Sequence, residues 1–273
     1  MASSKNFVAA FDDIASYKEI FNDCHAEKID RKSAAKKIAY IYENFLSDGH
    51  TAVEWLKKAV ALGDKNSRFK IAEIFRDGRG VEVDGARAIM WFSKILNDKT
   101  LPDHERYAAA FEIATMFHEG RAVPRSDTTA IKYFTLSAKA GVVTARVAYN
   151  TLAKIYSCGD EITPNIEMTL HWLTKAIEVG SNGAAWNVAK IFRDGKFGVR
   201  QNGEKALEIL RVPASKKFDA INKVTALRMI AEIYDKGLGG ITADKEKAAN
   251  LYQEAALIND EWIHAINNLQ MRA

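Results

Sequence analysis

The five-residue word Ile-Phe-Arg-Asp-Gly occurs twice in the chain, and its adjacent arginine and aspartate make it the first candidate for chemistry. It begins at Ile74 and again at Ile191, 117 residues later. Such a duplication would be expected both for a catalytic loop that occurs twice and for a fold built of repeats. At three related positions elsewhere in the chain, His-Glu-Gly, Ser-Cys-Gly and Asp-Lys-Gly stand in place of Arg-Asp-Gly. Since chemistry needs fixed residue types and a turn needs only the glycine, we interpret the word as the end of a helix.

The other residues capable of acid–base or nucleophilic chemistry form no recognised constellation. His118 and Glu119 are adjacent, but neighbouring helix residues point about 100° apart, so we interpret them as solvated residues at a helix end. The string Ser-Ala-Ala-Lys at 33–36 matches the Ser-x-x-Lys motif of β-lactamases but lacks its partner motifs. The six histidines form no His-Glu-x-x-His motif and no cluster with cysteine. We therefore predict no catalytic residues, no metal site, no cofactor and no enzyme activity.

Composition and charge indicate a folded chain without a membrane span. Hydrophobic residues make up 48% of the 273 residues. No run approaches the roughly 18 apolar residues of a spanning helix. The net charge of +4 is compatible with an anionic partner but is too small to indicate one. Cys24 and Cys158 form no Cys-x-x-Cys pair and are too few for a disulfide framework, so we expect a soluble, cytoplasmic protein.

Aligning the copies of the word reveals a repeat of helix-forming columns. We number them from a small residue two positions before the isoleucine, which is alanine at 39, 72, 114, 153, 189 and 231. A branched apolar residue precedes this alanine, and an aromatic residue follows it at +3. At +6 stand the glycines that we expect to end the helix: Gly78, Gly120, Gly159, Gly195 and Gly237. Their spacings of 42, 39, 36 and 42 residues are typical of repeat proteins.

Each copy is followed by a second helix with its own start signal. In all six copies, a residue that can cap a helix N-terminus stands four positions before a further small residue: Asp48, Asp84, Ser126, Asn165, Asn202 and Asp244. Each repeat therefore contains helix A, ended by glycine where the +6 column has one, and helix B, begun by the cap. Pro213 predicts that helix B of the fifth repeat ends early.

These columns resemble the Sel-one-like repeats (SLR), which are relatives of the tetratricopeptide repeats (TPR). The family's helix A pattern is matched at 108–120 and 226–237, and its helix B pattern at 78–92 and 237–252. The resemblance implies an all-α fold: a right-handed α-solenoid of about six stacked helix-turn-helix repeats with capping helices. We expect an N-terminal capping helix region at 1–32, the repeat solenoid at 33–260 and a C-terminal capping helix at 261–273.

An arc of each helix A, at positions −3, +1 and +4, points away from most of the core columns. In TPR-like solenoids this arc lines the concave groove where partner peptides bind. Nine residues of the arc are candidates for a partner-binding groove: Phe69, Arg76, Phe111, His118, Asn150, Trp186, Lys190, Arg193 and Arg228. For the three aromatic residues, packing against the next helix A explains the position as well as binding does. We expect Arg193 to lie at an exposed helix end.

Three functions fit the sequence, with unequal support. The first is a non-enzymatic scaffold or adaptor that mediates protein–protein interaction through the concave groove. For it, the resemblance implies roles in bacterial signalling or envelope-complex assembly. The second is a binder of nucleic acid or another anionic polymer through basic inter-helix loops that contain Arg76, Arg79, Arg121, Arg125, Arg193, Lys196 and Arg200. Aspartates in the same loops reduce the support for this second function. The third function, a hydrolase, has the least support. The sequence identifies neither the protein or peptide partner nor the oligomeric state.

Overall fold

The computed structural model describes residues 4–158, 161–215 and 220–270, and the side-chain surroundings between residues 10 and 260 within those ranges. These residues form thirteen α-helices, three short 3₁₀ turns and no strand, which confirms the predicted all-α class. The α-helices are α1 (Ser4–Asn22), α2 (Lys28–Asn44), α3 (Gly49–Ala61), α4 (Ser67–Asp77), α5 (Gly85–Leu96), α6 (Asp103–Glu119), α7 (Asp127–Ser137), α8 (Val142–Cys158), α9 (Ile166–Glu178), α10 (Asn182–Asp194), α11 (Gly203–Arg211), α12 (Ala220–Lys236) and α13 (Lys245–Gln270).

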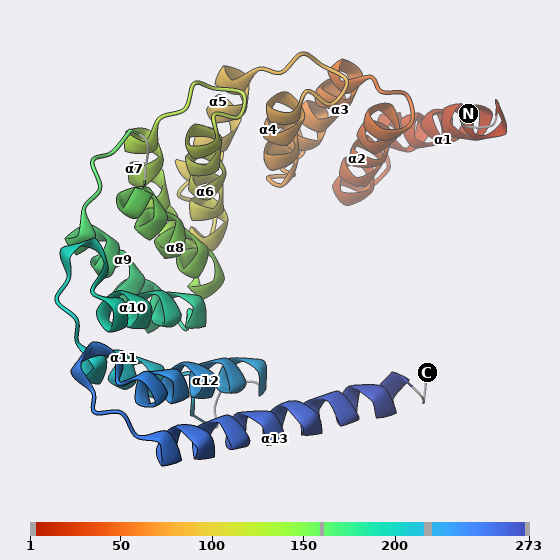
Figure 1. The fold of residues 1–273 in the computed structure, drawn as a ribbon. Coiled ribbons are helices and arrows are strands. Elements are labelled where there is room, and N and C mark those ends of the chain that lie inside the picture. The colour runs from red at the N-terminus through yellow and green to blue at the C-terminus, as the bar shows by residue number, and fades with distance from the viewer. Residues whose placement is uncertain (1–3, 159–160, 216–219, 271–273) are drawn as a thin grey trace. The chain divides into compact units, whose positions relative to one another are not determined.

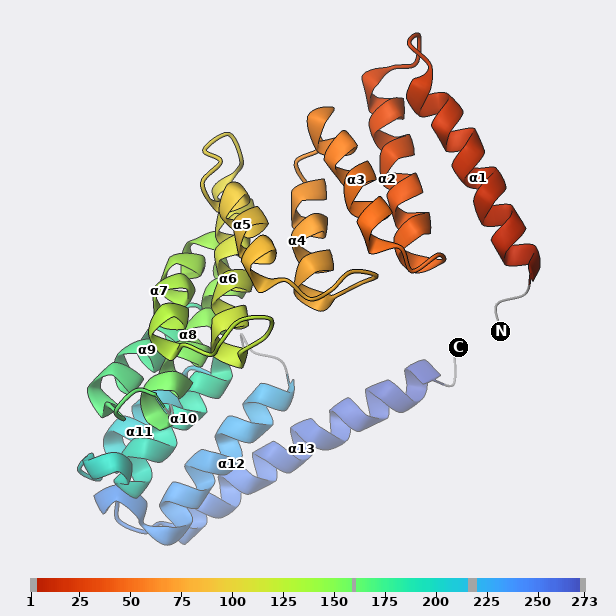
Figure 2. The ribbon, with the colours of Figure 1, turned by 90° about the horizontal axis from the view of Figure 1, so that it is seen from above.

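The chain divides into two compact parts, residues 1–148 and 149–273, and the division falls within α8. In the N-terminal part, helices A and B pair as α2 with α3, α4 with α5, and α6 with α7 (Figure 1). In the C-terminal part, α10 pairs with α11 and α12 with α13. Seen from above, α1 to α4 lie side by side in chain order (Figure 2). Neighbours in sequence are thus neighbours in space, as a solenoid of repeats requires.

The six predicted helix caps are confirmed. In each, a side-chain oxygen accepts a hydrogen bond from the backbone N–H three residues further on, over 2.8–3.2 Å. This bond satisfies one of the N–H groups that have no partner within the first turn of a helix. Every helix B from α3 to α13 therefore begins where the sequence predicts.

The predicted ends of helix A are also confirmed where the structure describes them. Gly78, Gly120, Gly195 and Gly237 follow their helices with left-handed backbones, at φ between 64° and 69°. A side chain at these positions would be strained, which explains why glycine recurs. The fifth predicted glycine, Gly159, lies outside the described residues.

The small-residue column of helix A is buried in every repeat. The six alanines of this column are between 0% and 3% exposed. Around it, the N-terminal part buries large side chains such as Ile71, Phe92 and Ile113 completely, and the C-terminal part does the same with Leu210. Because alanine has only a methyl group, helix backbones can approach there while the flanking large residues fill the core.

The helix boundaries at the two ends of the chain differ from the expected ones. The first repeat already begins at Lys28, inside the expected capping region 1–32, and α1 precedes it. At the other end, α13 runs unbroken from Lys245 to Gln270, across the boundary that we placed at residue 260. Its sequence contains neither glycine nor proline, so no residue stops the helix there. In the fifth repeat, α11 ends at Arg211, as Pro213 predicts.

In the N-terminal part, the loop after each helix A rests on the start of the previous helix B. The backbone N–H of Gly49, the first residue of α3, donates to the carbonyl oxygen of Gly80 in the next repeat over 3.0 Å. A Cβ atom added at Gly49 would lie 2.0 Å from the carbonyl oxygen of Arg79. One added at Gly85 would lie 2.0 Å from that of Ala122. Glycine is therefore required where two successive repeats meet backbone to backbone.

Candidate partner-binding surface

The three aromatic candidates pack between helices. Phe69 meets the buried Phe92 edge-on with ring centroids 5.1 Å apart, and Phe111 meets Phe134 in the same way at 5.6 Å. Trp186 packs against the core cluster of the C-terminal part that contains Leu210. Its buried indole N–H has no hydrogen-bond partner among the described residues. These contacts favour packing over binding, because edge-to-face ring pairs stabilise a core without any partner. The contacts of Phe69 and Phe111 are with the helix B of their own repeat and not, as we expected, with the next helix A.

The two candidate arginines of the duplicated word are ion-paired within the chain. Arg76 pairs with Asp77 and with Glu112 of the next helix A. Arg193 pairs with Asp194 and, over 2.8 Å, with Glu232 of the next helix A. The Arg193 side chain is only 15% exposed, so our expectation of an exposed helix end is wrong. The neighbouring repeat supplies a carboxylate that draws the guanidinium into the contact between the two helices.

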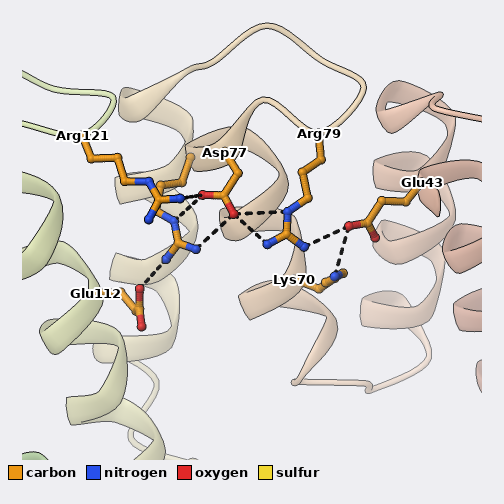
Figure 3. Close-up of polar contacts among 7 residues, drawn as sticks. Glu43, Lys70, Asp77, Arg79, Glu112 and Arg121 are labelled. Atoms are coloured by element: carbon orange, nitrogen blue, oxygen red, sulfur yellow. Dashed lines mark hydrogen bonds and ion pairs between the residues drawn. The ribbon is translucent and has the colours of Figure 1, made fainter.

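Arg76 belongs to a larger ion network that joins the first three repeats (Figure 3). Asp77 lies at its centre, where it accepts hydrogen bonds from Arg76 and Arg79 and pairs with Arg121 over 3.1 Å. Arg79 also donates to Glu43 over 3.1 Å. We call this set the loop ion network, and its members are Glu43, Lys70, Arg76, Asp77, Arg79, Glu112 and Arg121.

The loop ion network holds its central carboxylate ionised. Burial disfavours the charged form of Asp77, but hydrogen bonds from Arg76 and Arg79 outweigh it and lower the pKa to about 2. Glu112 behaves in the opposite way, because burial raises its pKa despite the nearby charge of Arg76. Asp77 is thus the firm anchor of the network, and Glu112 is its weaker end.

The remaining four candidates have different surroundings. The Nδ1 atom of His118 lies 2.8 Å from a carboxylate oxygen of the fully buried Asp127, which ties α6 to α7. The amide of Asn150 donates to the hydroxyl of Ser181 over 3.0 Å. Lys190 and Arg228 are the two of the nine candidates with exposed side chains. Neither side chain has an ion pair or a side-chain hydrogen bond with the described residues that a partner would have to displace.

A cleft in the N-terminal part contains exposed aromatic rings. It has a volume of about 680 Å³ and is lined by α1, α2, α3 and α4. Tyr40 and Phe45, at the end of α2, are 57% and 51% exposed and meet edge-on at 6.1 Å. Tyr17 of α1 lines the same cleft, with the ammonium of Lys37 4.8 Å from its ring centre. We call this the aromatic cleft, defined by Tyr17, Lys37, Tyr40, Phe45 and Lys70.

A second cleft lies in the C-terminal part and has a different chemistry. It has a volume of about 410 Å³ and is lined mainly by α8, α9 and α10. The charged residues that line it in the described part of the chain are all lysines, and one exposed ring stands beside them. We call this the lysine cleft, defined by Asn150, Lys154, Ser157, Lys190, Lys196 and Phe197.

Both clefts use the arc of helix A that the sequence pointed to, though largely through other residues. Tyr40, Lys154 and Lys190 all occupy the +1 position, next to the small alanine. Of the nine candidates, Asn150 and Lys190 line a cleft. Phe45 and Phe197 were missed because they lie beyond the helix columns, where a helical wheel gives no direction. The sequence did contain a signal for both residues: each is aromatic at a repeat position where the other repeats have a small or polar residue.

The basic loop edge is largely neutralised by carboxylates. Arg76, Arg79 and Arg121 pair with Asp77, and Arg125 pairs with Asp127. Further along, Arg193 and Lys196 both pair with Asp194. Binding of phosphates at this edge would have to break these ion pairs, so the structure gives no support to the nucleic-acid alternative.

Comparison with known proteins places these observations in context. Six segments match the family model of the Sel1 repeat, and together they cover more than half of the chain: 45–64, 66–96, 108–142, 147–181, 183–211 and 224–260.

Within the described residues, no helix is long and apolar enough to cross a membrane. In the same residues, no group of three His, Cys, Asp or Glu side chains is arranged to hold a metal ion.

Several solved structures are similar to the chain at low sequence identity. One is a Sel1 repeat protein from Oxalobacter formigenes, with 20% identity over 87% of this chain and 91% of that one, at a TM-score of 0.48. A second is a protective antigen present in uropathogenic Escherichia coli strains that displays an SLR fold, with 19% identity, coverages of 90% and 61%, and a TM-score of 0.36. A third is an immunity protein from Pseudomonas aeruginosa, with 18% identity, coverages of 82% and 82%, and a TM-score of 0.34.

Proposed function

Because the chain belongs to the Sel1 repeat family, we propose that it is a non-enzymatic scaffold that holds a protein partner against the helix A surface of its repeats. Sel1 repeat proteins generally act as protein-interaction scaffolds. The observation that carries the proposal for this chain is the aromatic cleft. A fold buries its large rings where it can, yet Tyr40 and Phe45 are more than half exposed inside a cleft.

The chemistry of the aromatic cleft suits a protein segment. Tyrosine and phenylalanine provide large apolar area with few rotatable bonds, and aromatic residues are enriched in protein interfaces. Lys37 stands at the same cleft and can pair with polar groups of a partner, whereas Lys70 is already paired with Glu43. A volume of about 680 Å³ has room for several side chains of a bound segment.

The rest of the proposal concerns compartment and process. We place the protein in the cytoplasm of a bacterium, where it assembles a signalling or envelope complex. Cys24 and Cys158 support this compartment, because both are free and exposed. The process follows from the family resemblance alone.

Site-specific photo-crosslinking in cells of the native host tests the proposed surface. A benzoylphenylalanine replaces Tyr40 in one variant and Met90 in a control variant. Met90 is suitable because it is 44% exposed and lies on α5, a helix B outside both clefts. We expect a discrete crosslinked partner from position 40 that position 90 does not give. Identical products from both positions, or none from position 40, would contradict the assignment of the aromatic cleft.

A further inference from the structure

Phe197 adopts a backbone conformation that its side chain disfavours. It lies in the loop after α10 with φ 56° and ψ 31°, in the left-handed region. The +8 positions of four other repeats hold Ser47, Gly80, Ala122 and Gly239, with φ between 52° and 67°. A bulky residue is strained in this region, where glycine is not. The Phe197 ring is also 58% exposed, so core packing does not explain its presence. Strain of this kind is often retained at functional sites.

The lysine cleft beside Phe197 contains two lysines, Lys154 and Lys190, that no described carboxylate neutralises. Lys154 and Lys190 are exposed, and no carboxylate of the described residues lies within ion-pair distance of either. Lys196 lies 3.5 Å from Asp194, which is itself already paired with Arg193. Among the residues that the structure describes, no aspartate or glutamate lines the cleft. This differs from the basic loop edge, where five arginines are paired with carboxylates: Arg76, Arg79, Arg121, Arg125 and Arg193.

The floor and walls of the lysine cleft are suited to a peptide. Leu173 and Ile191 contribute apolar surface, while Asn150, Asn187 and Ser157 contribute hydrogen-bonding groups. Polar groups arranged around an apolar floor are typical of sites that fix the orientation of a bound chain. A volume of about 410 Å³ accommodates a few side chains.

We propose that the lysine cleft binds an acidic peptide segment of a partner protein. Carboxylates of the segment pair with Lys154 and Lys190, and an apolar side chain next to them packs on the exposed ring of Phe197. Charge complementarity favours this occupant, since the described lining residues include three lysines and no carboxylate. A nucleic acid needs a longer basic track for its successive phosphates, and the nearby Arg193 is already paired with Asp194 and Glu232. The inference rests on the proposed function as a protein-binding scaffold.

Peptide selection on the purified full chain tests this proposal. A phage-displayed library of random dodecapeptides is selected in parallel on the wild-type chain and on the double variant Lys154→Glu/Lys190→Glu. We expect the wild-type chain to enrich peptides that combine aspartate or glutamate with a large apolar residue. Their affinity, measured by fluorescence polarisation, is expected to fall at least about tenfold in the double variant. Enrichment of neutral or basic peptides, or equal enrichment on both proteins, would overturn the proposal.

Three controls separate this site from general electrostatics and from misfolding. The double variant Lys132→Glu/Lys139→Glu changes the net charge equally but lies outside both clefts, so it should retain the affinity. Phe197→Gly should weaken binding while keeping or raising the melting temperature, because glycine relieves the backbone strain. If an oligouridylate bound through the same lysines as tightly as the selected peptides, the ligand of the lysine cleft would be a nucleic acid and the peptide proposal would be wrong. Crosslinking from Tyr40 does not depend on these variants, so failure of this proposal can be told from failure of the proposed function.

Discussion

Single residues show most clearly what a helical wheel can and cannot predict. The wheel placed Phe69, Phe111 and Trp186 on the arc that points away from most core columns. The structure turns these rings onto the helix B that follows, because a wheel gives a direction from the helix axis but not the neighbour that lies there. The spacing was a usable signal: Phe92 and Phe134 each stand 23 residues after the ring they contact. In the fifth repeat the same spacing leads from Trp186 to Ile209, which packs on the same cluster.

Replacement of Trp186 tests its assignment to the core. Trp186→Ala removes a large, partly buried ring and should lower the free energy of unfolding by about 3 kcal/mol. Trp186→Phe keeps most of the ring and removes the buried N–H that has no partner, so its effect should be under about 1.5 kcal/mol. Urea denaturation followed by circular dichroism measures both. If Trp186→Ala unfolds at the same urea concentration as the wild type, the ring is a surface residue after all.

At the scale of elements, the sequence predicted helix starts and stops but not the contacts between loops. Caps such as Asp84 and end glycines such as Gly78 act within one turn, so their patterns are readable from local sequence. The loop ion network joins Glu43 to Arg79 across 36 residues, and no local pattern reveals that pairing. The unbroken α13 was missed for a related reason: we inferred a boundary from the family architecture, although the local sequence contains no helix-stopping residue.

A matched pair of substitutions tests the seating of one repeat's loop on the previous helix B. Gly80 and Ala122 share the +8 position and a left-handed backbone, at φ 67° and 63°. A Cβ atom at Gly80 would lie 2.4 Å from the backbone nitrogen of Gly49, so Gly80→Ala should destabilise by about 2 kcal/mol or more.

Ala122→Gly is the control for this pair. It should change stability by less than about 1 kcal/mol in either direction, since relief of strain offsets the greater freedom of glycine in the unfolded chain. Both variants are compared with the wild type by urea denaturation. Equal effects of the two substitutions would mean that the loops do not rest on the helices as described.

The loop ion network predicts a specific dependence of stability on pH. The folded-state pKa of Asp77 is lowered from 3.8 to about 2, so its ionised form stabilises the fold fully above about pH 4. This contribution, about 2 kcal/mol, is lost as the pH falls from about 4 towards 2. The difference in unfolding free energy between wild type and Asp77→Asn should therefore be constant from pH 7 to 5 and shrink below pH 4. A difference that stays constant down to pH 3 would show that the arginines do not hold this carboxylate.

For the molecule as a whole, the repeats supply two clefts of different chemistry on corresponding helix faces. The aromatic cleft belongs to the N-terminal part and the lysine cleft to the C-terminal part. The repeat pattern predicted the helix A arc as the working surface, and Asn150 and Lys190 of that arc do line a cleft. The repeat pattern could not predict in which repeats the helix A arc is exposed. Exposure depends on whether the next helix contributes a ring or a carboxylate that covers the arc.

The central claim is that Tyr40 and Phe45 anchor a protein partner in the aromatic cleft. It is tested most directly by the dissociation constant of the partner identified by crosslinking, measured by calorimetry for the wild type, Tyr40→Ala/Phe45→Ala and Met90→Ala. Because aromatic anchors typically contribute about 2 kcal/mol or more, we expect the double variant to bind at least about 30-fold more weakly with a nearly unchanged melting temperature. Met90→Ala should bind as the wild type does. An unchanged dissociation constant for the double variant would contradict the account.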